Sequence, residues 1–158
     1  MTADNSLREL LSRALAWSDA HVSFDDSVAG LAPSLRGVRP QGLPHSAWEL
    51  VEHLRLAQSD ILEFCASADY RDKKWPEDYW PAAPSPESDD AWDSSVAAYR
   101  TDREALQRLT VSPDVDLTAA IPHGSGQTYA REIVLVLDHA AYHVAQIVTV
   151  RQLLGAWR

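Results

Sequence analysis

The chain is poor in cysteine and in basic residues, and each shortage excludes a class of protein. Its single cysteine, Cys65, has no partner within the chain for a disulfide, so a disulfide-stapled secreted domain is excluded and we expect a cytoplasmic location. Only 14 lysines and arginines accompany 23 acidic residues, which gives a net charge of −9. Because nucleic acids and anionic lipid surfaces bind clustered positive charge, we expect neither as a partner.

Long apolar runs are also missing. The longest uninterrupted one covers residues 133–137, far short of the roughly 20 residues that span a membrane. The first ten residues, MTADNSLREL, contain early acids and no apolar core, so they do not read as a signal peptide. At 158 residues and 46% hydrophobic composition, we expect one globular domain over residues 1–158 and no membrane partner.

Proline and glycine are confined to a few places, which makes the helical segments easy to find. All nine prolines and five of the six glycines fall in residues 30–44, 76–86 and 113–126, with Gly155 as the exception. The segments between these gaps carry apolar residues at steps of three and four, typical of helices, and none alternates with period two. The expected helices cover residues 6–29, 46–64, 88–109 and 128–157.

Two of these helices begin with a sequence that favours an N-terminus. Ser6 with Glu9, and Ser46 with Glu49, have the spacing of a capping box, in which each side chain accepts a hydrogen bond from the other residue's backbone N–H. Four amphipathic helices of this length predict an all-α fold, a four-helix bundle.

The connection between the second and third helices is long and aromatic. Residues 66–87 are too many for a tight hairpin, so they predict a crossover that lets the two helices run parallel. Its four aromatic residues indicate that it packs against the bundle; these are Tyr70, Trp75, Tyr79 and Trp80. The last helix, in contrast, carries few charges, which suggests that it is central or shared with a second subunit in a homodimer.

Two histidines lie one turn apart on the last helix. His139 and His143 can therefore direct their rings toward one point, a common arrangement for metal ligands. The pair alone favours the other interpretation, two buried histidines that form hydrogen bonds to their neighbours. His53 borders the apolar stripe of the second helix, however, and burying several imidazoles costs free energy unless they share a partner. A metal on three neutral imidazoles keeps positions open for a substrate.

The protease motif HExxH is absent, because residues 139–143 read HAAYH. No general-base glutamate therefore follows the first histidine. Three further residues are candidates for the surroundings of the site. His21 lies on the stripe of the first expected helix and is a pocket residue, a fourth ligand or a core histidine. Glu49 precedes His53 by one turn and could accept a hydrogen bond from its ring, and Gln146 follows His143 by nearly a turn and could bond a ligand.

Three stretches of the sequence resemble the DinB family of metal-binding four-helix proteins. They are HSAWELVEHLRLAQSDILEF at 45–64, PHGSGQTYAREI at 122–133 and DHAAYHVAQIVTVRQLLGAW at 138–157. The family pattern of one histidine on the second helix and an HxxxH pair on the last maps onto His53, His139 and His143. The resemblance implies a bundle with a parallel helix pair, zinc or nickel on the three histidines, and frequent homodimers.

The resemblance also implies a chemistry for some relatives, the transfer of a low-molecular-weight thiol such as bacillithiol or mycothiol to an electrophile. Others isomerise maleylpyruvate with a thiol cofactor. A divalent cation held by imidazoles is a Lewis acid that lowers the pKa of a thiol or water molecule. Our first interpretation is a metal-dependent thiol transferase. The alternatives are a metal-dependent hydrolase, a non-catalytic metal- or small-molecule-binding stress-response bundle, and a structural dimer with vestigial histidines.

Overall fold

The computed structural model describes residues 3–157, and within them it is all-helical, with a single isolated bridge between Ala120 and Thr128. Four of its six α-helices are long, which confirms the predicted all-α class. The elements are α1 (Ala3–Ala14), α2 (Phe24–Val28), α3 (Pro33–Arg36), α4 (Ala47–Ala66), the 3-10 turn η1 (Glu77–Tyr79), α5 (Asp89–Val111) and α6 (Tyr129–Leu153).

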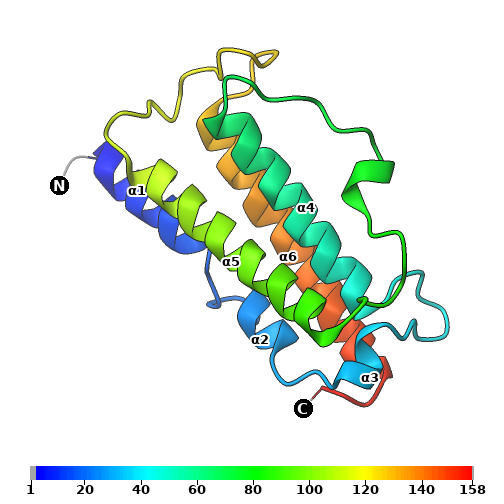
Figure 1. Ribbon diagram of the computed structural model, residues 1–158. Coiled ribbons are helices and arrows are strands. Elements are labelled where there is room, and N and C mark those ends of the chain that lie inside the picture. Colours follow the sequence, from blue (N-terminus) through cyan, green and yellow to red (C-terminus); the bar gives the residue numbers. More distant parts are fainter. Residues whose placement is uncertain (1–2, 158) are drawn as a thin grey trace.

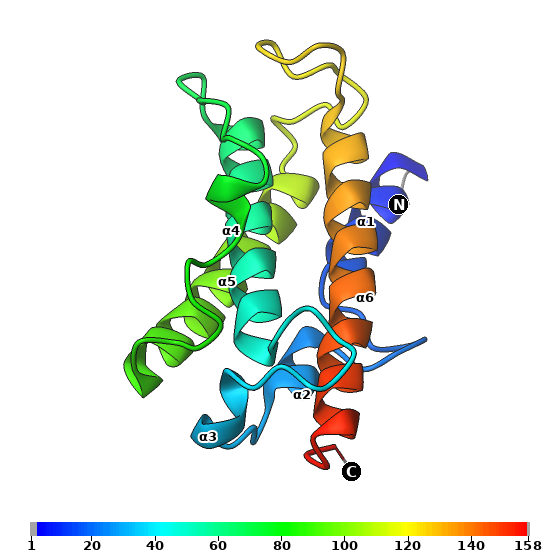
Figure 2. The same cartoon turned by 90° about the vertical axis from the view of Figure 1, so that its right-hand side faces the viewer.

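The long helices lie along one another in the order α1, α5, α4 and α6 (Figure 1). Helices α4 and α5 run in the same direction, and α6 runs back against α4. The crossover that joins α4 to α5 returns the chain along the outside of α4, as Figure 2 shows from the side. Helices α4 and α6 are therefore direct neighbours, which places the middle of one opposite the middle of the other.

The helix starts are fixed by hydroxyl caps. The predicted capping box of α4 is confirmed: Ser46 Oγ accepts from the Glu49 N–H at 3.2 Å, and Glu49 Oε2 accepts from the Ser46 N–H at 2.8 Å. Ser88 and Thr128 cap α5 and α6 in the same way through one side-chain oxygen each. Each such cap contributes about 1 kcal/mol to stability. Helices α4, α5 and α6 therefore begin directly after Ser46, Ser88 and Thr128, where the sequence predicts a start.

The prediction of one helix over residues 6–29 is wrong. Helix α1 begins at Ala3, so Ser6 lies inside it and forms no N-cap, and the helix ends at Ala14. Residues 15–23 form a linker, after which Ser23 caps the short helix α2 by accepting from the Asp26 N–H. Trp17 is 44% exposed. The apolar residues keep their helical spacing through this linker, although the helix has ended. A new helix begins only after the cap at Ser23.

The last helix ends earlier than the predicted residue 157. Helix α6 stops at Leu153, and Gly155 adopts a left-handed conformation with φ +68°. Glycine takes this conformation without the strain that a Cβ would cause, so it commonly ends a helix. Arg151 then holds the turned chain by donating from Nε and Nη2 to the Ala156 carbonyl and from Nη1 to the Ser27 carbonyl.

By length and composition, α6 could cross a membrane, a property that counting uninterrupted apolar runs does not detect. A core helix of a helical protein passes the same test. Of the apolar window in α6, 33% of the residues are buried, and the helix packs against α4, α2, α1 and α5. Its buried residues point toward these neighbours and its remaining apolar face is uncovered.

The crossover packs on the bundle, as predicted. Asp60 of α4 is buried and accepts hydrogen bonds from two crossover hydroxyls, Tyr79 at 2.6 Å and Tyr70 at 3.1 Å. Lys73 approaches the same carboxylate at 3.4 Å. Burial first, and then the hydrogen bond to Asp60, raises the pKa of Tyr79, so this hydroxyl remains a donor. These bonds hold η1 against the outside of α4.

Candidate metal centre

Three histidines come together between α4 and α6. His53 comes from α4, and His139 and His143 come from successive turns of α6. Each offers a ring nitrogen, and these nitrogens all lie within 4.8 Å of one another. The Nε2 atoms of His53 and His139 are 3.0 Å apart. His53 and His143 are buried, so the cluster lies in the wall between two helices and not on a flexible surface.

Hydrogen bonds fix the orientation of two of the three rings. His53 Nδ1 donates to the backbone carbonyl of Tyr79 at 2.7 Å, and His143 Nδ1 donates to Gln146 Oε1 at 2.6 Å. A carbonyl oxygen only accepts, so Nδ1 carries the hydrogen in each ring. In the neutral rings Nε2 then carries the free lone pair, which is the form that binds a metal.

The environment keeps these rings neutral at ordinary pH. Burial first, and then the neighbouring histidines, lowers the pKa of His139 and of His143 to about 4. Burial likewise lowers the pKa of His53, which the hydrogen bond to the Tyr79 carbonyl partly offsets. Three adjacent imidazoles resist protonation because each added charge would lie buried beside the others.

Aromatic rings from the crossover surround His53. The Trp80 ring stacks on it with centroids 3.9 Å apart and planes 3° apart, and His45 stacks on Trp80 at 4.2 Å. Trp75 meets the imidazole of His53 edge-on, with ring centroids 6.4 Å apart. On the α6 side, Tyr142 lies against His143 at 4.9 Å. The imidazole of His53 is thus held by stacking as well as by its hydrogen bond.

Two of the three residues expected around the site have other roles. His21 lies in the linker after α1, exposed, with Nδ1 2.8 Å from the Val22 carbonyl. It is not a member of the histidine group, because the helix that would have carried it ends at Ala14. Glu49 is buried, but its carboxylate bonds Arg39 and the Ser46 N–H. The acceptor for His53 is the Tyr79 carbonyl instead.

Gln146 does lie at the site, where it bonds the ring of His143 itself. Sequence reasoning missed Asp60, Tyr79 and Trp80 as supports of His53. A backbone carbonyl acceptor leaves no trace in residue type, so only the aromatic content of the crossover could have pointed to this segment.

The residues fit a divalent cation. In zinc sites the metal–nitrogen distance is about 2.0–2.1 Å, so two nitrogens on one tetrahedral ion lie roughly 3.3 Å apart. The 3.0 Å between the Nε2 atoms of His53 and His139 is close to that spacing. The group contains three nitrogen donors and no thiolate or carboxylate. Such a donor set leaves coordination positions for other molecules, unlike a closed structural zinc site.

Comparison with known proteins agrees with this geometry. A family model described as the DinB superfamily matches residues 16–147, well over half of the chain. The matched region contains α4, α5, the crossover and all three clustered histidines. Neither the curated proteins nor the solved structures gave a match.

Proposed function

The chain belongs to the DinB superfamily, and on that basis we propose that it is a metal-dependent enzyme whose centre is held by His53, His139 and His143. The observation that carries the proposal is the convergence of three ring nitrogens within 4.8 Å of one another. Two of these rings have their Nδ1 atoms committed to fixed acceptors. Three neutral imidazoles buried together are costly unless they share a ligand.

The metal we propose is zinc or nickel. Imidazole nitrogen is a ligand that both ions accept well, and the absence of carboxylates from the group disfavours magnesium and calcium. Three protein ligands from two helices leave one or more positions open, which is the pattern of catalytic metal sites.

The reaction we propose is transfer of a low-molecular-weight thiol, such as bacillithiol or mycothiol, to a small electrophile. When bound, the metal supplies Lewis acidity that lowers the pKa of the thiol. The histidine group contains no carboxylate to act as a base, which favours activation by the metal. The thiol proton passes to solvent, the sulfur–carbon bond forms, and the leaving group departs with its electron pair. His53, His139 and His143 remain neutral throughout, while Gln146 and the Tyr79 carbonyl hold two of them.

A thiol screen tests this proposal. Untagged protein loaded with zinc or nickel is mixed with bacillithiol, mycothiol, cysteine or coenzyme A, and conjugation to monochlorobimane is followed by fluorescence. We expect conjugation that is lost on chelation and in His53→Ala, and retained in Ala145→Leu, which changes an exposed residue of α6. Metal-dependent ester hydrolysis without any thiol would instead indicate the hydrolase. Bound metal with no turnover in either assay would contradict an enzymatic role and favour the binding protein.

We interpret α1, α4, α5 and α6 as a four-helix bundle, with α4 and α5 as its parallel pair. The packing of α4 on α5 and α6, and of α1 on α5, supports this arrangement. The family resemblance also implies a homodimer, and we propose that its subunits contact each other through the exposed apolar face of α6. Val134, Tyr142 and Leu153 are all more than half exposed there, within an arc of roughly 100° of the helix. Light scattering of the wild type and of Val134→Glu tests it, because a charge in that face should yield monomers.

A further inference from the structure

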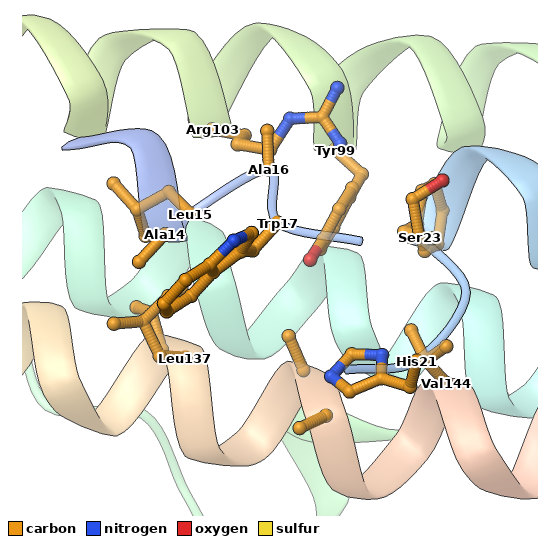
Figure 3. A pocket seen from close by; sticks show the side chains of 14 residues that line it. Ala14, Leu15, Ala16, Trp17, His21, Ser23, Tyr99, Arg103, Leu137 and Val144 are labelled. Carbon is orange, nitrogen blue, oxygen red and sulfur yellow. The ribbon is translucent and has the colours of Figure 1, made fainter. Parts of the chain in front are cut away.

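A hollow lies beside α6, on a different face of the helix from the histidine cluster. It forms where α1 ends at Ala14 and the linker of residues 15–23, not a continued helix, passes over α5 and α6. Its volume is about 210 Å³. Figure 3 shows Trp17 and His21 of the linker around this space, with Tyr99 of α5 behind them and Leu137 and Val144 of α6 below.

The surface of α6 under the hollow is apolar and includes two small side chains. Ala140 and Ala141 both line it, and neither is long enough to fill it. Protein interiors rarely keep spaces larger than a water molecule. An apolar cavity of about 150 Å³ can already hold a molecule of the size of benzene. The hollow is therefore large enough for one aromatic ring.

Aromatic and polar groups of the walls restrict the ligand further. The hydroxyl of Tyr99 points into the hollow (Figure 3). Burial raises the pKa of this side chain to about 12, so its hydroxyl is a hydrogen-bond donor at neutral pH. The indole of Trp17, at the mouth, offers a flat face on which an aromatic ring can stack. One donor and one aromatic wall favour a ring that carries an oxygen.

The charge around the hollow favours a neutral ligand over an anion. Arg103 is the cation that lines it, and its Nη2 lies 2.9 Å from the Asp25 carboxylate. Asp25 also accepts from Arg100, so both positive charges already have the same carboxylate as their partner. The Arg103 Nε is buried and has no hydrogen-bond acceptor among residues 3–157.

We propose that this hollow is a binding site for a small neutral aromatic molecule with a hydroxyl or carbonyl oxygen, of the phenol class. The ring lies against Ala140, Ala141 and Trp17, and its oxygen accepts from the Tyr99 hydroxyl. The site is separate from the histidine cluster, because His139 and His143 face α4 and do not line it. It does not depend on the proposed enzymatic role.

Titration of the full chain with phenol, followed by amide chemical shifts in NMR spectra, tests the proposal. We expect saturable shifts for Val136, Ala140 and Val144, with a dissociation constant below about 10 mM. Ala141→Leu should weaken binding at least tenfold by filling the space, whereas Ala145→Leu, one turn along on an exposed position, should not change it. Tyr99→Phe should weaken binding about three- to tenfold, the effect of one hydrogen bond.

Three results would overturn the proposal. The first is no saturable shift around the hollow with phenol, especially if Ala141→Leu raises the melting temperature, because the hollow is then only a packing defect. The second is tighter binding of benzoate than of phenol, which would assign the site to anions. The third is phenol affinity that is unchanged in Tyr99→Phe and equal to that of benzene, which would remove the oxygen from the ligand class. Metal content is measured on the same samples, so failure of this site and failure of the metal centre are told apart.

Discussion

The two faces of α6 differ in how completely they are filled. The face toward α4 carries His139 and His143, whose rings meet edge-on. His139 Nε2 lies 3.0 Å from His53 Nε2, and His143 Nδ1 donates to Gln146. A different face carries Ala140, Ala141 and Val144 below a hollow of about 210 Å³. One helix thus presents a tightly organised polar cluster on one side and unfilled apolar space on the other.

The difference follows from the helices opposite each face. Helix α4 starts at a capping box and continues for 20 residues without interruption, so it faces α6 along most of its length. Helix α1 ends after 12 residues, and a linker continues over the part of α6 that lines the hollow. A metal centre needs rigid supports on both sides, whereas a ligand pocket needs space. The histidine cluster lies where α4 supplies a rigid support, and the hollow lies where the linker leaves space.

Removing a ring of the cluster should have the largest effect. In His139→Ala we expect the affinity for zinc to fall by more than about 100-fold, because two imidazoles replace three and second-sphere changes alone cost 10- to 100-fold. Competition with a chromophoric chelator measures this. Zinc affinity in His139→Ala that stays close to that of the wild type would remove His139 from the metal ligands.

Acid should destabilise the metal-free protein through the same cluster. Burial first, and then neighbouring histidines, lowers the pKa of His139 and His143 from 6.5 to about 4. The unfolded chain therefore takes up protons before the folded one, and stability present above pH 6.5 is lost as the pH falls toward 4. We expect a loss of roughly 1–3 kcal/mol, measured by urea unfolding at several pH values. His143→Asn should reduce this slope, and an unchanged slope would contradict burial as its cause.

The support of His143 should contribute less than the ligands themselves. Gln146→Leu removes the acceptor for His143 Nδ1 and should lower zinc affinity about tenfold. Its matched control is Gln152→Leu, at an exposed position on the same helix. Equal zinc affinities in the two variants would show that the hydrogen bond seen at 2.6 Å does not position the ring.

The crossover offers a comparison between two tyrosines that bond the same carboxylate. Tyr79→Phe and Tyr70→Phe each remove one hydrogen bond to Asp60, and each should cost about 1 kcal/mol of stability. Only Tyr79 also supplies the carbonyl that accepts from His53. Zinc affinity should therefore fall severalfold in Tyr79→Phe and stay unchanged in Tyr70→Phe. An equal fall in both variants would contradict a specific role of Tyr79 in orienting His53.

The smallest effect should come from the face of α6 that lines the hollow. Ala141→Leu partly fills the hollow, and we expect its zinc affinity to stay within about twofold of the wild type, since none of the three clustered rings lines the hollow. A large loss of zinc affinity in this variant would show that the two faces are coupled.

Much of the architecture was readable from the sequence because it depends on local signals. The cap at Ser46, the aromatic crossover and three of the four breaker-free segments predicted their elements, because these signals act over a few residues. The convergence of His53 with His139 and His143 followed from helix periodicity together with the family resemblance. The predicted helix over residues 6–29 failed because apolar spacing continues through the linker, although the stripe there does not face the core.

Other features could not be read because they arise only from tertiary packing. The Tyr79 carbonyl contacts His53 across 26 residues of sequence, and a backbone acceptor has no residue type to recognise. Glu49 was expected beside His53 on helical spacing, but its carboxylate is held by Arg39 from the preceding loop. The hollow next to α6 depends on where α1 stops, which the sequence pattern did not indicate.

Metal analysis of the protein, expressed without a histidine tag and purified without chelators, tests the central claim most directly. Mass spectrometry of the dissolved metals should find about one zinc or nickel per chain, and His53→Ala prepared alongside should have lost it. Less than about a tenth of an equivalent of metal in the wild type, or an equal content in the variant, would contradict a metal centre on these three histidines.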